Sequence, residues 1–199
     1  MRQEIIEGAV SLILKEIGED PNRPGLKETP TRVARMYKEV FRGYDRTQEP
    51  KVTAFLNGND GLVYNEMIID TGNFYSHCEH HVVPFSGQYW FGYIPHAKGR
   101  LIGLSKIGRL VDYFSARLQI QERLVHDIVS HIWRILSEGA KAPLGMGMVM
   151  KAEHLCKTMR GVKKKGFMTT SKMLGNFLDN KGGARAEFLQ FVSQDNTIK

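Results

Sequence analysis

Cysteine is scarce in this sequence: two occur in 199 residues, Cys78 and Cys156. So few thiols exclude a small secreted scaffold that is held together by several disulfides. No apolar run approaches the ~18 residues that a membrane-spanning helix needs. Acidic residues interrupt the apolar N-terminal stretch, which argues against a signal peptide. These absences predict a cytoplasmic protein that does not associate with membranes and whose two thiols stay reduced.

Basic residues outnumber acidic ones, with 28 Lys and Arg against 21 Asp and Glu, and the formal net charge is +7. Such a surplus favours contact with nucleic acid or with small anionic substrates, although a merely basic surface has the same composition. The sequence has no RNA-binding signature, no basic helix with heptads and no paired zinc-finger spacing. No motif therefore favours nucleic-acid binding, and charge alone does not decide between binding of small anionic substrates and a merely basic surface.

The composition is that of a globular protein, with 42% hydrophobic and 25% charged residues. A chain of this length can bury the core of one domain. We expect a single domain over residues 1–199, with an N-terminal helical part at 1–43 and a core at 62–190.

Hydrophobic periodicity predicts the order of helices and strands. Apolar residues three and four positions apart indicate a helix over 2–17. A second helix follows, with Thr29 as its N-cap, Pro30 in the first helical position and Gly43 at its end. Further elements are a loop at 44–61, strands at 62–71, 87–96 and 146–156, a short strand leading to a helix from Ser105, a helix in 119–139, a strand within 157–177 and a helix at 184–194. This order indicates an α+β domain with a mainly antiparallel sheet.

The sequence around both cysteines is rich in histidine. Cys78 and His81 have the spacing C-x-x-H on an expected loop at 73–81, and Cys156 ends an expected strand. Zinc takes sulfur and nitrogen ligands in tetrahedral geometry, and a catalytic site leaves the fourth position to water. These three residues predict such an open site, although a lone buried cysteine is often only a small hydrophobic residue. A fourth protein ligand would make the site structural, and the candidates for it are His77, His80 and His154.

Five segments of the sequence together resemble the GTP cyclohydrolase I family, in the expected order and spacing. They are ETPTRVARMY at 28–37, CEHH at 78–81, GLSKIGRLV at 103–111, LQIQERL at 118–124 and HLCKTMRG at 154–161. The resemblance covers about residues 5–190. It implies the tunnelling fold, an antiparallel sheet with a pair of helices on one face. It also implies assembly into a homodecamer of two pentamers, with active sites shared between neighbouring subunits.

The activity that the resemblance implies is a hydrolase reaction at the carbon–nitrogen bonds of a cyclic amidine. GTP and water give formate and 7,8-dihydroneopterin triphosphate, the first step of folate and pterin biosynthesis. In that family the zinc ligands match Cys78, His81 and Cys156, the same residues that the spacing indicates. Zinc lowers the pKa of a bound water toward neutrality, which suits attack on C8 of guanine.

Other site residues are carried over from the same resemblance. His80 and His154 match the two acid/base histidines, and Glu122 matches the carboxylate that recognises guanine. Gln121 is a weaker candidate for contact with the base or the ribose. The residues expected at the triphosphate are Ser105, Lys106, Arg109 and Arg160, with Arg32 as a further contact.

Two alternatives are weighed against this hypothesis. One is a zinc-stabilised nucleotide- or RNA-binding protein without turnover, which would not need His80 and His154 beside an open metal site. The other is an enzyme of the same fold that acts on a different purine or pterin. Glu122 and the cluster of predicted phosphate contacts favour a guanosine triphosphate.

Overall fold

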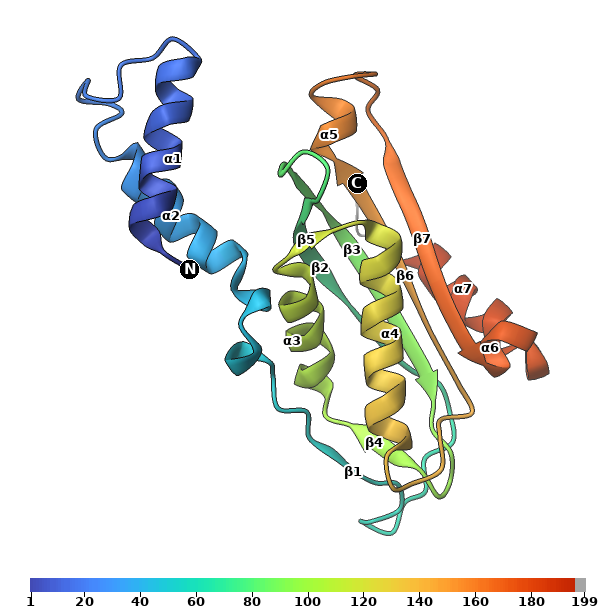
Figure 1. Ribbon diagram of the computed structural model, residues 1–199. Helices are drawn as coiled ribbons and strands as arrows, with labels where there is room; N and C mark the ends of the chain where they lie inside the picture. The colour runs from blue at the N-terminus through green and yellow to red at the C-terminus, as the bar shows by residue number, and fades with distance from the viewer. Residues whose placement is uncertain (196–199) are drawn as a thin grey trace.

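The centre of the computed structural model, which describes residues 1–195, is a five-stranded sheet (Figure 1). The strands lie side by side in the order β5, β2, β3, β6 and β7. Their bounds are Leu118–Gln119 for β5, Ile68–Cys78 for β2, Pro84–Ile94 for β3, Gly145–His154 for β6 and Phe167–Gly175 for β7. The long strands pair antiparallel, whereas β5 pairs with β2 in parallel. A separate antiparallel pair joins β1 (Ala54–Leu56) to β4 (Arg100–Ile102).

Two helices, α3 (Leu104–Ser115) and α4 (Gln121–Ser137), cover one face of this sheet (Figure 1). Side chains alternate between the faces of a strand, and the core beneath the helices takes alternate residues of β3 from Tyr89 to Tyr93 and of β6 from Met146 to Ala152. From α4, Leu124, Ile128 and Ile132 are fully buried in it. Burying each such side chain contributes about 1.5–3 kcal/mol, so this layer holds the strand ends in place.

The opposite face carries a smaller core under the C-terminal helices α6 (Asn176–Asp179) and α7 (Ala184–Gln194). Phe177 and Phe188 are fully buried there. A Cβ atom at Gly92 of β3 would come within 2.7 Å of the Phe188 ring. Glycine at this position therefore lets α7 approach the sheet closely.

The N-terminal helices α1 (Gln3–Glu16) and α2 (Thr29–Val40) pack against each other and lie to one side of the sheet (Figure 1). None of the residues of α1 is buried. Two short 3₁₀ helices, η1 (Arg42–Tyr44) and η2 (Arg46–Gln48), lead from this pair toward the sheet. Within residues 1–195 no helix is long and apolar enough to cross a membrane.

The α+β class and the helix pair on one face are as predicted, whereas several boundaries differ. Thr29 is the first helical residue and not the N-cap, which is Glu28, and the helix ends at Val40 instead of Gly43. The strand predicted at 62–71 begins at Ile68 and continues to Cys78. The stretch NFYSHC was expected to be a loop because it contains no continuous apolar run. In the structure it is a half-buried strand, along which buried and more exposed residues alternate.

Three further differences concern short elements. β1 lies inside the predicted 44–61 loop, and β5 lies where the helix of 119–139 was expected to begin. Cys156 is in a one-turn helix, α5 (Leu155–Thr158), directly after β6 and not on the strand itself. Segments of two to four residues carry too little periodicity to be found from sequence. The division at residues 43 and 62 stays a prediction.

Candidate metal centre

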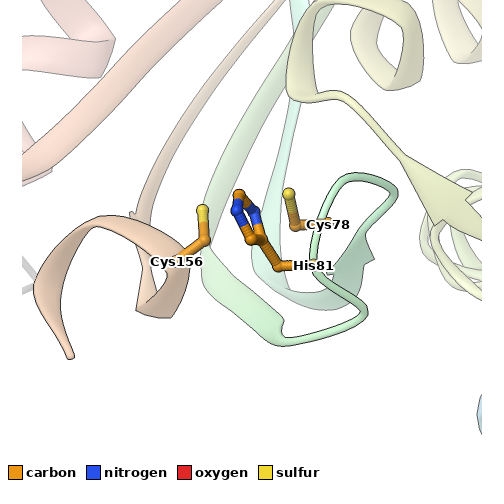
Figure 2. A group of neighbouring side chains, drawn as sticks. All are labelled: Cys78, His81 and Cys156. Carbon is orange, nitrogen blue, oxygen red and sulfur yellow. The ribbon is translucent and has the colours of Figure 1, made fainter. Parts of the chain in front are cut away.

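The side chains of Cys78, His81 and Cys156 converge although they come from two distant parts of the chain (Figure 2). One ligand atom of each lies within 4.8 Å of those of the other two. Figure 2 shows all three side chains pointing into the same space, Cys78 from the end of β2, His81 from the turn that follows it and Cys156 from α5. Two thiols and an imidazole in this arrangement could hold a metal ion.

The turn between β2 and β3 presents Cys78 and His81. Cys78 ends β2 and is 5% exposed. Its carbonyl oxygen accepts hydrogen bonds from the backbone N–H groups of His81, at 3.4 Å, and Val82, at 2.8 Å. Val82 has a φ of 56°, a left-handed conformation that costs an ordinary L-residue about 1–2 kcal/mol. The hydrogen bonds of this tight turn therefore hold the Cys78 and His81 side chains close together, and the backbone of Val82 is strained as a result.

Cys156 reaches the same place through the β3–β6 pairing. The last residue of β6, His154, lies opposite Phe85 at the start of β3, so α5 begins beside the β2–β3 turn. Burial raises the pKa of the Cys156 thiol and the neighbouring Cys78 raises it further, whereas Arg160 lowers it.

Arg160 joins the group through His81. Its Nη1 donates a hydrogen bond to Nε2 of His81 at 2.6 Å. Because a guanidinium can only donate, Nε2 accepts and carries no proton.

The neighbouring histidines of the turn occupy different surroundings. His77 precedes Cys78 on the same strand, so their side chains point to opposite faces. The His77 ring packs edge-on against Phe41, with 5.1 Å between centroids. His80 is closer, with its Nδ1 3.7 Å from Sγ of Cys78. In the described part of the chain, neither is a member of the group of mutually close ligand atoms, and neither is His154.

His154 is held on two sides. Its ring stacks on Phe85, with 4.4 Å between centroids and 5° between planes. Its Nε2 lies 2.8 Å from Oε1 of Gln121. Burial lowers the pKa of His154, the nearby Glu122 carboxylate raises it, and Lys157 lowers it. Glu122 itself is exposed in the first turn of α4, which places the predicted guanine-binding carboxylate beside this histidine.

Gln121 is 1% exposed and lies beneath the site. Its Nε2 donates to the carbonyl oxygens of Met150, at 2.9 Å, and Met168, at 3.2 Å, with Oγ1 of Thr170 3.0 Å away. Carbonyl oxygens accept only, so the amide nitrogen must face them and Oε1 must face His154. Nε2 of His154 therefore donates, and its Nδ1 is the nitrogen without this bond.

The residues predicted at the triphosphate separate into two sets. Arg160 lies beside the metal group, in contact with His81. Ser105, Lys106 and Arg109 lie in the first half of α3, whereas the other end of this helix leads into β5, which pairs with Cys78. At a rise of 1.5 Å per residue, Ser105 is roughly 15 Å along the axis from that end. Arg32 is on α2, paired with Glu28 at 2.7 Å. Ser105, near the start of α3, is therefore remote from the Cys78 end of its own subunit, and α2, which carries Arg32, lies to one side of the sheet (Figure 1).

Comparison with known proteins gives a family over nearly the whole chain. The family model described as GTP cyclohydrolase I matches residues 6–193. The chain belongs to the GTP cyclohydrolase I family. Proteins named GTP cyclohydrolase 1 from Bacillus mycoides, Bacillus cereus and Bacillus anthracis are each 43% identical to it over 190 residues, which is 95% of this chain and 95% of each relative.

The apo crystal structure of an archaeosine synthase QueF-Like protein is also similar, with a TM-score of 0.41 and 13% identity over 53% of this chain and 92% of that one. The recognition of the GTP cyclohydrolase I family from five segments is confirmed by the family model and by the Bacillus relatives. So is the tunnelling fold, an α+β domain with an antiparallel sheet and a helix pair on one face.

Several side chains that support this GTP cyclohydrolase I site were not found from sequence. Phe85 stacks on His154, and Thr170 contacts Gln121. Arg123 pairs with Glu79 of the CEHH motif and donates to Oε1 of Gln119 at 3.0 Å. Arg123 is the third residue of the QER triplet, directly after Gln121 and Glu122, and its place in that motif could have marked it as a candidate site residue. Phe85 and Thr170 depend on strand register, which the sequence does not display.

Proposed function

We propose that this member of the GTP cyclohydrolase I family hydrolyses GTP, opening the imidazole ring of guanine and releasing C8 as formate. Rearrangement and ring closure would then give 7,8-dihydroneopterin triphosphate, for folate or pterin biosynthesis. The observation that carries the proposal is the convergence of Cys78, His81 and Cys156 within 4.8 Å, next to His154 and Glu122. A metal site with ionisable groups beside it suits hydrolysis better than binding alone.

Zinc is the ion that this donor set fits. Zinc bonds of about 2.0–2.3 Å to nitrogen and sulfur hold tetrahedral ligands roughly 3.5 Å apart, so small side-chain rotations suffice from the separations described. Three protein donors leave the fourth position open, as in catalytic zinc sites. A bound zinc ion would supply an activated water for attack on C8. Both thiols would bind zinc as thiolates, and the bond to the metal would offset the cost of deprotonating Cys156, whose pKa is raised in the protein without metal.

Protein groups around the metal would recognise guanine and move protons. We assign Glu122 to accept hydrogen bonds from N1–H and the exocyclic amine, a bidentate contact that a carboxylate can make. His154 would exchange protons through Nδ1, because Gln121 engages Nε2. His80, with 65% of its side chain exposed, would serve as the second proton carrier. Gln121, predicted as a contact to base or ribose, would act chiefly by orienting His154.

The triphosphate would bind to cations from more than one subunit. Arg160 lies beside the metal group, whereas Ser105, Lys106 and Arg109 lie toward the far end of α3. In a homo-oligomer, a neighbouring copy can supply these residues, together with Arg32. We therefore propose active sites shared between subunits, in a decamer of two pentamers. A cytoplasmic location also stays a prediction.

The decisive experiment is turnover by the purified protein. With zinc and GTP it should release formate and give a product that becomes fluorescent after oxidation to the pterin. Controls are the protein stripped of metal by a chelator and the substrate GDP, which lacks the γ-phosphate. Absence of formate above the stripped control would contradict the proposal. Binding of GTP without formate would favour a nucleotide-binding protein, and turnover of another purine in place of GTP would favour a different enzyme.

A further inference from the structure

A cavity of about 600 Å³ lies away from the metal group, between η1, η2, α3 and α4. Three arginines from three different segments line it: Arg46 of η2, Arg117 just after α3 and Arg134 of α4. We propose that this cavity binds a small phosphate-bearing molecule, at a site separate from the one that holds GTP. The proposal does not depend on the proposed function.

The charges that line the cavity do not balance. Glu49 supplies its single carboxylate against the three guanidinium groups. His131 adds no charge, because its Nδ1 accepts from Nη2 of Arg134 at 3.2 Å and burial lowers its pKa. Its Nε2 lies 3.6 Å from Oε1 of Glu49. The excess of two positive charges matches a phosphate monoester, which carries about −1.5 to −2 near neutral pH.

Arg117 is held in place before any ligand arrives. Its Nε donates to the carbonyl oxygen of Gly43 at 2.8 Å. Its guanidinium carbon lies 4.7 Å from the ring centroid of Tyr113 and 4.8 Å from that of Phe114. The terminal amino groups of Arg117 make no hydrogen bond within residues 1–195. A guanidinium that is already oriented loses little freedom on binding a phosphate oxygen.

The other two arginines also have donors to spare. The side chain of Arg46 forms no ion pair with any residue that the structure describes, and Arg134 uses one amino group on His131. Three guanidinium groups around one hollow repel one another, and a bound phosphate would turn that repulsion into charge-assisted hydrogen bonds. Arginine is well matched to phosphate because its planar fork can donate two parallel bonds.

The cavity shares no residue with the GTP site. Neither the metal ligands nor any predicted substrate contact lines it. Arg109, the predicted phosphate contact of α3, lines an adjoining hollow of about 180 Å³ with Arg42 and Asp112, which has Tyr113 alone in common with the cavity. A phosphate bound at Arg46, Arg117 and Arg134 is therefore a second binding event on the same subunit.

The test is isothermal titration calorimetry of the full-length, zinc-loaded protein with inorganic pyrophosphate, at low salt. The double variant Arg46→Gln/Arg134→Gln should weaken binding at the cavity by at least about tenfold, because each arginine removed deletes a charge-assisted bond. Lys98→Gln/Lys141→Gln is the matched control, since it removes two exposed lysines outside the cavity. That control should change the affinity by less than about threefold.

Two further measurements separate the cavity from its alternatives. Arg109→Gln/Arg160→Gln, which impairs the proposed GTP site, should keep pyrophosphate binding at the cavity. Loss of all binding in that variant, or unchanged binding in Arg46→Gln/Arg134→Gln, overturns the proposal. So does a smaller mass of Arg46→Gln/Arg134→Gln by light scattering, because the arginines would then hold a second copy of the chain. Formate release without pyrophosphate should be the same for Arg46→Gln/Arg134→Gln as for the unmodified protein.

Discussion

Oε1 of Gln121 lies 2.8 Å from Nε2 of His154, and this contact determines which ring nitrogen of the histidine carries the proton. The direction of the bond follows from the other end of the amide, whose nitrogen faces the carbonyl oxygens of Met150 and Met168. Stacking on Phe85 holds the ring plane. A buried amide and an aromatic ring thus orient one histidine, and Nδ1 is the ring nitrogen outside the bond to Gln121.

Gln121→Leu should lower kcat by at least about tenfold while KM for GTP changes little, because His154 loses the acceptor that orients its ring. The change also removes donors from two carbonyl oxygens, which should cost about 1–3 kcal/mol of stability. Steady-state kinetics and thermal unfolding measure the two effects. Thr170→Val is the matched control: it removes one partner of the Gln121 amide and leaves the bond to His154 intact. Equal kcat losses in both variants would show that the loss comes from packing alone.

Cys156→Ser should abolish both zinc binding and formate release, because it leaves one thiol and one imidazole at the site. The subunit should still fold, since Cys156 is only partly buried in a one-turn helix after β6. Metal analysis and circular dichroism measure these outcomes. His77→Asn is the control and should retain zinc, because that ring packs against Phe41. Full zinc content in Cys156→Ser would contradict the ligand set.

Mixing two inactive variants should restore activity if active sites are shared. In the proposed shared site, one subunit supplies the metal ligands (the metal half) and its neighbour supplies Lys106 and Arg109 (the phosphate half). Cys156→Ser lacks a working metal half, and Lys106→Gln/Arg109→Gln lacks a working phosphate half. In randomly mixed oligomers from equal co-expression, about a quarter of the sites combine an intact metal half with an intact phosphate half of a neighbour. Formate release should therefore reach about a quarter of the unmodified rate. A mixture no more active than its parents would show that each subunit works alone.

Asp70→Asn should stabilise the protein at neutral pH. Oδ2 of Asp70 accepts from the Tyr89 hydroxyl at 2.8 Å, and burial raises the pKa of Asp70 above its usual value, although this bond lowers it in part. A raised pKa in the folded state means that the carboxyl favours folding below its unfolded pKa, about 3.9, and that this contribution is lost as pH rises through the folded pKa.

Melting temperatures across pH 4 to 7.5, at one protein concentration, test this prediction. The gain from Asp70→Asn should be largest at the neutral end and shrink toward pH 4. Glu187→Gln, which removes an exposed carboxylate of α7, should show no such trend. If the increase in melting temperature of Asp70→Asn were the same at every pH, the burial of the ionised carboxylate would not be the cause of the stabilisation.

Most long elements could be predicted from sequence. The helices over 3–16 and 184–194 were found within a residue of their ends, because amphipathic spacing is a local property. Strand β2 was misplaced, since its second half alternates polar residues across a half-buried strand. The candidate metal ligands Cys78, His81 and Cys156 could be named because thiols and imidazoles are the groups zinc prefers, whatever the fold, and the structure brings these three side chains together.

The sequence by itself determined the candidate donor groups, the α+β order and, through five motifs, the GTP cyclohydrolase I family. Tertiary structure decided which groups meet. The β3–β6 register places Phe85 against His154, and α4 directs Gln121 beneath that ring. Helix α3 carries Lys106 and Arg109 in its first half, whereas its other end leads into β5, beside Cys78. The physical reason is range: periodicity and ligand chemistry act locally, whereas strand register and helix packing join residues that are far apart in the sequence.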